Sequence, residues 1–140
     1  MITKTGSARW HGELKTGKGE VSTESGALSA QPYGFNTRFE GKPGTNPEEL
    51  VGAAHAACFS MALSKGLADA GVTDVTIETT SAISMDKDGD GFTIKKAALT
   101  VRVMGEGDKI AIEKAAKEAE AGCPVSKLLN AEITMDLTVG

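Results

Sequence analysis

Apolar and polar residues alternate along several stretches of the chain, and this alternation predicts its first strands. Residues 4–14 and 18–24 alternate loosely around a few apolar side chains, which indicates two strands joined by a short turn. Residues 35–39 alternate more clearly. This pattern predicts a third, short strand with two phenylalanines on one face and Arg38 on the other.

One long apolar stretch, from Asn46 to Gly71, predicts a helix with both ends marked. The side chain of Asn46 can cap the first turn, and Pro47 suits the first helical position because no N–H is needed there. Gly71 suits the left-handed residue after the last turn. Residues 50–64 contain no charged side chain, which predicts burial on every side of this helix. The stretch is expected to be too short, and too polar at its ends, to span a membrane.

The middle of this helix is built from small residues. The side chains from Gly52 to Ala57 are small apart from His55, and small residues let two helix backbones approach closely. We therefore expect residues 52–54 to be the crossing point of two such helices, one from each subunit of a dimer. The alternative is an Ala-rich helix packed under a sheet of its own chain.

The second half of the chain predicts a long hairpin. Residues 75–85 and 92–103 alternate between apolar and polar, and the apolar parity changes at residues 95–96, which indicates a β-bulge. The acidic run at 86–91 matches the opening of a calcium-binding loop. The twelfth position of that motif is an alanine, and the flanks read as strands, so a hairpin turn is the better interpretation.

The C-terminal part predicts two helices and a strand. Residues 108–121 form an amphipathic helix, and Cys123 precedes a proline that can start a short helix through Leu129. Residues 133–139 alternate as a final strand. The element order β3-α-β2-α2-β defines an α+β class, and we expect residues 1–140 to form a single domain.

Composition and charge exclude several classes of partner and function. The net charge is −4 with no basic run, and aromatic residues make up 4% of the chain, so a nucleic-acid partner is not expected. No signal-like N-terminus or membrane partner is expected, which predicts a cytoplasmic protein. The two cysteines are too few for a secreted disulfide scaffold, and in a reducing compartment such a pair is redox-active or unrelated.

The cysteines differ in what could activate them. A reactive thiol needs a cation or a helix N-terminus to lower its pKa, because the thiolate is the nucleophile. Cys123 has a helix start beside it, whereas Cys58 lies in the middle of a helix and needs a cation from elsewhere. Arg38 is the best candidate for that cation, and Glu48 could orient it.

Spacing along the central helix adds a constraint. Glu48 and Cys58 are ten residues apart, which is about 15 Å along a straight helix axis. In an antiparallel pair of helices that crosses at Ala53, Glu48 of one subunit would lie level with Cys58 of the other. An active site at Cys58 should therefore be shared across a homodimer.

Three segments carry a family resemblance. They read Gln-Pro-Tyr-Gly-Phe-Asn-Thr-Arg-Phe-Glu at 31–40, Thr-Asn-Pro-Glu-Glu-Leu-Val-Gly-Ala-Ala-His-Ala-Ala-Cys-Phe-Ser-Met at 45–61, and Ala-Gly-Cys-Pro-Val-Ser at 121–126. Together they resemble the OsmC/Ohr family of organic hydroperoxide peroxidases, over a stretch from about Trp10 to the C-terminus. The first segment is similar to the OsmC branch of that family.

The resemblance implies an intertwined homodimer with long buried central helices packed between mixed sheets and two sites at the interface. It implies that Cys58 is the peroxidatic nucleophile and that Cys123 resolves its sulfenic acid to a disulfide. It further implies that Arg38 and Glu48 hold the thiolate and polarise the peroxide, Glu48 coming from the partner subunit relative to Cys58. Organic hydroperoxides are the expected substrates, a dithiol or lipoylated protein the reductant, and no cofactor or metal is needed.

The substrate pocket and the alternatives complete these expectations. A mostly apolar pocket that favours alkyl peroxides is expected around four residues: Phe35, Phe39, Phe59 and Met61. A single His55 among alanines is typical of a hydrogen-bonded core residue, and we leave it out of the catalytic set. Two rival functions use the same features: a thiol–disulfide oxidoreductase or redox sensor, and a non-catalytic binding dimer.

Overall fold

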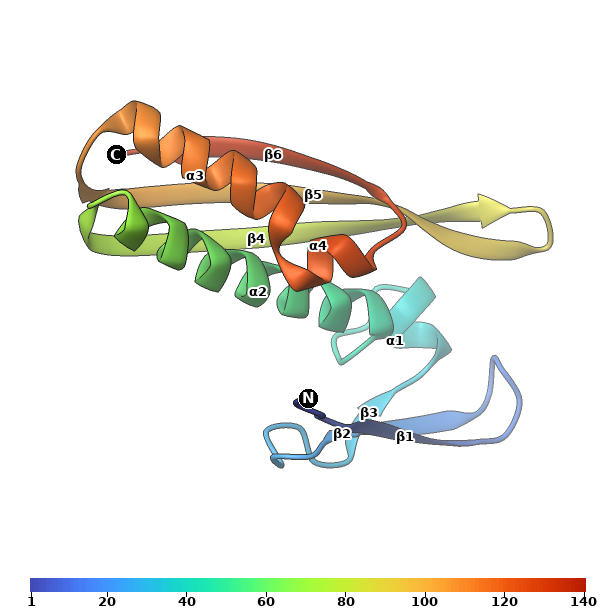
Figure 1. The fold of residues 1–140 in the computed structure, drawn as a ribbon. Helices are drawn as coiled ribbons and strands as arrows, with labels where there is room; N and C mark the ends of the chain where they lie inside the picture. The colour runs from blue at the N-terminus through green and yellow to red at the C-terminus, as the bar shows by residue number, and fades with distance from the viewer. The chain divides into compact units, whose positions relative to one another are not determined.

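A computed structural model describes all residues, 1–140, and divides the chain into two compact units, Met1–Leu50 and Val51–Gly140. It contains two three-stranded sheets and four helices, which is the predicted α+β class (Figure 1). The predicted element order holds, except that the third strand lies earlier and a short helix follows it.

The N-terminal unit is an antiparallel sheet in the order β1-β2-β3. All six residues of β1 are exposed, and no apolar side chain of this unit is buried. Neither face of this sheet therefore buries an apolar side chain, and the unit has no core of its own. Its elements are β1 (Gly6–His11), β2 (Lys18–Thr23), β3 (Gln31–Tyr33) and α1 (Phe35–Phe39).

The expected strand at 35–39 was wrong, because these residues form helix α1. Thr37 closes the first turn: its hydroxyl accepts from the Gly34 N–H and donates to the Gly34 carbonyl, each at 3.0 Å. The rings of Phe35 and Phe39 meet one turn apart, with their centroids 4.8 Å from each other. Alternation over five residues cannot separate a strand from one such turn.

The C-terminal unit is a sheet in the order β4-β5-β6 with helices on one face (Figure 1). Strands β4 and β5 are antiparallel, and β5 and β6 are parallel. The core joins side chains of α2, β5 and α3, including Phe59, Leu63, Leu99, Val101 and Ile112. The elements are α2 (Pro47–Asp69, which starts in the N-terminal unit), β4 (Thr73–Asp88), β5 (Gly91–Glu106), α3 (Lys109–Gly122), α4 (Pro124–Leu128) and β6 (Glu132–Val139).

The long hairpin and its bulge are confirmed. Ser84 pairs with Lys96 while Met85 pairs with Ile94, so Lys95 is the extra residue that switches the parity. The strands turn at Gly89, whose positive φ of 60° suits a tight hairpin. The amphipathic helix expected over 108–121 is confirmed as α3. Asp108 caps it, and its buried residues are Ile112, Ala115, Ala116 and Ala119.

Both ends of the central helix α2 are confirmed, but its burial is not. The Asn46 side chain accepts from the Glu49 N–H at 2.9 Å, and Gly71 has a φ of +78°. One stripe is buried, and it contains Gly52, His55, Phe59, Leu63 and Leu67. The opposite stripe is exposed in the single chain and consists of Ala53, Ala57, Met61 and Ser64. The expected burial on every side was therefore wrong for one chain alone.

The expectation that α2 is too short to cross a membrane was also wrong. It has 23 residues and is the one helix of the chain that is long and apolar enough to do so. The core helix of a soluble protein passes the same test. The buried stripe of α2 packs into the core of the C-terminal unit, so we interpret it as a core helix.

The structure explains the glycine at position 52 differently from the expected crossing of two helices. A side chain at Gly52 would place its Cβ 2.7 Å from the carbonyl oxygen of Ser81 in β4. The small residue thus lets α2 approach the sheet of its own chain, which was the alternative interpretation. Ala53 and Ala54, by contrast, are exposed and do not serve that contact.

Candidate functional site

The structure brings the two cysteines together in the C-terminal unit. Cys58 is partly buried on α2 and packs against the core cluster that contains the fully buried Cys123. Both are free thiols. Burial is the largest effect and raises the pKa of Cys58. A hydrogen bond with the Val125 backbone opposes it, the neighbouring Cys123 thiol raises the pKa further, and Lys127 lowers it slightly. Within this unit, therefore, the thiolate of Cys58 is disfavoured.

Cys123 sits at the start of helix α4, as predicted. Its sulfur accepts from the Ser126 N–H at 3.3 Å and thereby caps the helix. The same thiol donates to the Ser126 hydroxyl at 3.1 Å. Ser126 was not among the predicted site residues, although its place three residues after a cap was a usable signal.

His55 is a buried, hydrogen-bonded core residue, as expected. Its Nε2 lies 2.9 Å from the Ser126 hydroxyl, and its Nδ1 lies 2.7 Å from the hydroxyl of Ser81 on β4. Burial lowers the pKa of His55, which favours the neutral imidazole. A continuous row of polar contacts thus runs from Cys123 through Ser126 and His55 to Ser81.

Arg38 and Glu48, which the sequence suggested as partners, form an ion pair in the N-terminal unit, and their catalytic roles stay predictions. The guanidinium donates to the carboxylate through Nε at 3.0 Å and Nη2 at 2.7 Å, a two-pronged contact that fixes its plane. The guanidinium also lies over the ring of Phe39, 5.3 Å from its centroid. Helix α1 presents Arg38, and the first turn of α2 presents Glu48.

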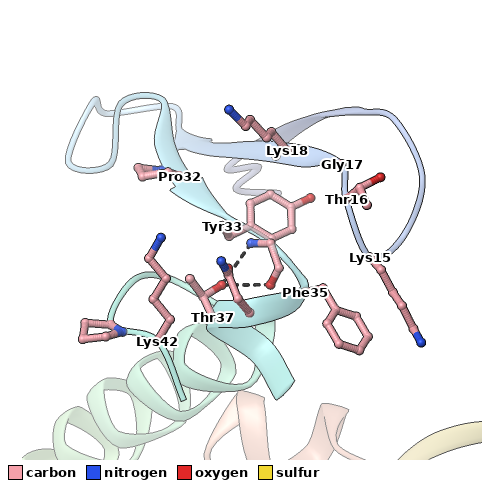
Figure 2. A pocket seen from close by; sticks show the side chains of 13 residues that line it. Lys15, Thr16, Gly17, Lys18, Pro32, Tyr33, Phe35, Thr37 and Lys42 are labelled. Carbon is pink, nitrogen blue, oxygen red and sulfur yellow. Dashed lines mark hydrogen bonds between the residues drawn. The ribbon is translucent and has the colours of Figure 1, made fainter. Parts of the chain in front are cut away.

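The four residues expected to bind substrate have different environments. Phe59 has no exposed surface and belongs to the core, so we no longer count it as facing a substrate. Met61 is 77% exposed and Phe39 is 36% exposed. Phe35 lines a pocket of the N-terminal unit beside the β1–β2 turn and Tyr33 (Figure 2). The pocket role of Phe35, Phe39 and Met61 stays a prediction.

The same pocket contains Lys15 of the β1–β2 turn and Lys18 at the start of β2. Figure 2 shows the side chains of Lys15 and Lys18 extending outward from the pocket rather than converging in it. No group of three or more metal-ligating side chains occurs in the chain. The predicted catalytic residues form two groups: Cys58 and Cys123 in the C-terminal unit, and Arg38 with Glu48 in the N-terminal unit.

Comparisons with known proteins agree with the fold and the motifs. The family model described as OsmC-like protein matches residues 39–138. Peroxiredoxin OsmC of Escherichia coli (strain K12) is 59% identical over 136 residues, covering 96% of this chain and 95% of that protein. Organic hydroperoxide resistance protein OhrA of Bacillus subtilis (strain 168) is 37% identical, covering 68% of this chain and 67% of that protein.

A solved structure of a related protein has a similar fold over nearly the whole chain. The crystal structure of the organic hydroperoxide resistance protein OhrB of Bacillus subtilis superposes with a TM-score of 0.70 at 27% identity, covering 99% of this chain and 98% of that chain. The fold, the paired cysteines and the family match together define a thiol protein of the OsmC class. The chain belongs to the OsmC-like protein family.

Proposed function

We propose that this protein is a cysteine-dependent peroxidase that reduces organic hydroperoxides to alcohols. The observation that carries the proposal is the packing of two free thiols, Cys58 and Cys123, in a chain 59% identical to a peroxiredoxin. The names of the relatives, organic hydroperoxide resistance proteins among them, favour organic peroxides as the substrate class.

The first step is attack by the Cys58 thiolate on one peroxide oxygen. The S–O bond forms as the O–O bond breaks, so the sulfur is oxidised to a sulfenic acid and the peroxide is reduced. The leaving alkoxide takes a proton and departs as the alcohol. A cation beside the reacting oxygens stabilises both the thiolate and this developing charge.

The second step forms a disulfide between Cys123 and Cys58. The Cys123 sulfur attacks the sulfenic sulfur of Cys58, and water leaves. An external dithiol then reduces the disulfide by two thiol–disulfide exchanges and is itself oxidised to a disulfide. We propose a dihydrolipoyl group or another dithiol as that reductant, because two electrons and two protons are needed per cycle.

The raised pKa of Cys58 requires a cation, and we propose that Arg38 supplies it from the partner subunit. Glu48 and Cys58 are ten residues apart on α2, which runs without a break from Pro47 to Asp69. Ten residues correspond to about 15 Å of helix. A homodimer with antiparallel α2 helices would bring the ion pair Arg38–Glu48 of the partner subunit to Cys58.

Two exposed surfaces support a homodimer. The stripe of small apolar residues on α2, with Met61 at 77% exposure, is uncovered in the single chain. The N-terminal sheet has no buried apolar side chain, although such a sheet needs a covered face to be stable. A second copy of the chain would cover both surfaces and leave two active sites at the interface.

A cytoplasmic location stays a prediction.

The proposal is tested by a single turnover of the reduced protein. One equivalent of cumene hydroperoxide, tert-butyl hydroperoxide or hydrogen peroxide is added, and free thiols and intact mass are followed with time. Cys58→Ser and Cys123→Ser serve as controls. We expect fast loss of two thiols with the organic peroxides, no reaction in Cys58→Ser, and arrest at a trapped sulfenic acid in Cys123→Ser.

The outcomes separate the rival functions. Thiols that survive organic peroxide but exchange rapidly with a small disulfide would replace the peroxidase with a thiol–disulfide oxidoreductase. Thiols that react with neither would leave only a binding protein. Equal or faster oxidation by hydrogen peroxide would refute the proposed preference for organic substrates.

A further inference from the structure

The hydroxyl of Ser126 connects the second cysteine to a buried histidine. The Cys123 thiol donates to the Ser126 hydroxyl at 3.1 Å, and that oxygen lies 2.9 Å from Nε2 of His55. On the far side of the ring, Nδ1 lies 2.7 Å from the hydroxyl of Ser81. These contacts join three separate elements, α4, α2 and β4, at one point.

The row of contacts is closed to solvent. Cys123 and His55 have no exposed surface, and Ser126 is 5% exposed. A proton that leaves the Cys123 sulfur therefore has no direct route to bulk water and must pass first to a protein group. Ser126 is the hydroxyl in contact with that sulfur, and His55 is the base behind it.

We propose that Ser126 and His55 form a proton relay that activates Cys123 for disulfide formation. Ser126 contacts the reacting sulfur, and His55 acts through Ser126. The proposal rests on the peroxidase function above, and it assigns to these two residues the resolving step alone. The first step, oxidation of Cys58, does not require them.

The proton balance of the step is complete. As the Cys123 sulfur attacks the sulfenic sulfur, its proton moves to the Ser126 oxygen while the Ser126 proton moves to Nε2 of His55. The S–O bond of Cys58 breaks, and the departing hydroxide becomes water by taking a proton from the Ser126 hydroxyl, which regains one from Nε2 of His55. His55 and Ser126 return to their starting states, so the relay is not consumed.

The surroundings of His55 suit the role of a proton acceptor. Burial lowers the pKa of His55, so the resting imidazole is neutral and Nε2 can accept. The Ser81 hydroxyl can receive the Nδ1–H and thereby hold the tautomer that leaves Nε2 free to accept from Ser126. The Ser126 N–H, which donates to the Cys123 sulfur at 3.3 Å, would stabilise the thiolate as it forms.

The test measures the two steps separately in the full-length reduced protein. A single equivalent of cumene hydroperoxide is added, Cys58 sulfenic acid is trapped by a dimedone-type reagent, and disulfide formation is followed by intact mass. The variants are Ser126→Ala, which removes the hydroxyl, and His55→Gln, which keeps a hydrogen-bonding side chain without an imidazole base. Ser60→Ala is the matched control, because Ser60 also bonds a β4 hydroxyl, Thr79, at 2.8 Å.

We expect Ser126→Ala and His55→Gln to slow disulfide formation by about 10²-fold, as loss of a proton acceptor does, while Cys58 oxidation keeps its rate. Ser60→Ala should leave both steps unchanged. Disulfide formation at the wild-type rate in both variants would overturn the relay, as would equal slowing of both steps, which indicates a structural role. If wild-type Cys58 does not react with the peroxide, the proposed function fails first, and the test reports that separately.

Discussion

The two units of this chain differ in how they are held together. Every buried apolar side chain lies in Val51–Gly140, where α2 and α3 pack on one face of a three-stranded sheet. Met1–Leu50 has a sheet of equal strand number but no buried apolar side chain. One unit has a core, and the other has polar contacts and exposed faces.

The difference extends to the candidate chemistry. The unit with a core buries Cys123 and His55 fully and Cys58 partly, and this burial raises the pKa of Cys58 and lowers the pKa of His55. The unit without a core carries Arg38 and Glu48 near its surface. The Cys58 thiol needs a cation and lies in the unit with a core. The Arg38–Glu48 ion pair keeps its charges near water and lies in the other unit. Association of two chains would combine them.

The largest effect should come from the ion pair of the N-terminal unit. We expect Arg38→Met to lower the second-order rate with organic hydroperoxide by about 10²–10³-fold, because it removes the charge that stabilises the thiolate and the leaving oxygen. The free energy of unfolding should change by at most about 1 kcal/mol, since the pair is partly exposed. Arg9→Met, at an exposed arginine of β1, is the control. An undiminished rate would remove Arg38 from the mechanism.

The difference in side-chain burial between the two sheets is tested by one valine substitution in each. Val101→Ala in β5 removes two methyl groups from a side chain that is 1% exposed, and it should lower the free energy of unfolding by about 2–3 kcal/mol. Val21→Ala in β2 should cost about 1 kcal/mol or less, because Val21 is half-buried. Urea denaturation measures both. Equal costs would show that the N-terminal sheet is as well covered as the core.

A charge on the exposed face of α2 should break the proposed dimer. Met61 and Ile110 are large apolar side chains on helices, 77% and 75% exposed, so aspartate at either position should leave the single chain folded. We expect Met61→Asp to raise the dimer dissociation constant by at least about tenfold, because burying an unpaired carboxylate is unfavourable. Ile110→Asp on α3 should not. Sedimentation at several concentrations measures both, and a monomeric wild type would refute the dimer.

The smallest expected effect is on the pH dependence of stability, and it should differ between the two histidines. Burial lowers the pKa of His55, so the unfolded chain binds more protons below its ordinary pKa of about 6.5. Stability should therefore fall as the pH falls below about 6.5, by at most about 1.4 kcal/mol per pH unit from this residue. His55→Gln should remove that slope, and the exposed His11→Gln should keep it, in urea denaturation at pH 7.5 and 5. An unchanged slope in His55→Gln would contradict the assignment.

Long periodic stretches were predicted well from the sequence, and short ones were not. The alternation in β4, β5 and β6 and the spacing in α3 correspond to the buried faces that the structure has. The strand expected at 35–39 was wrong because five residues alternate equally well in one helical turn. The contact of Arg38 with Glu48 could be expected from the sequence, because a cation near a thiol needs a carboxylate to orient it.

The sequence by itself determined the caps of α2 and α4, the bulge at Lys95, the family and the two cysteines, because each depends on a local pattern or a motif. Only the tertiary structure decided that one stripe of α2 is buried, that Gly52 faces its own sheet, and that His55 and Ser126 meet behind Cys123. Those contacts join residues 29 to 71 positions apart in the sequence. Spacing along a chain carries no information about such distances until the helices pack on the sheet.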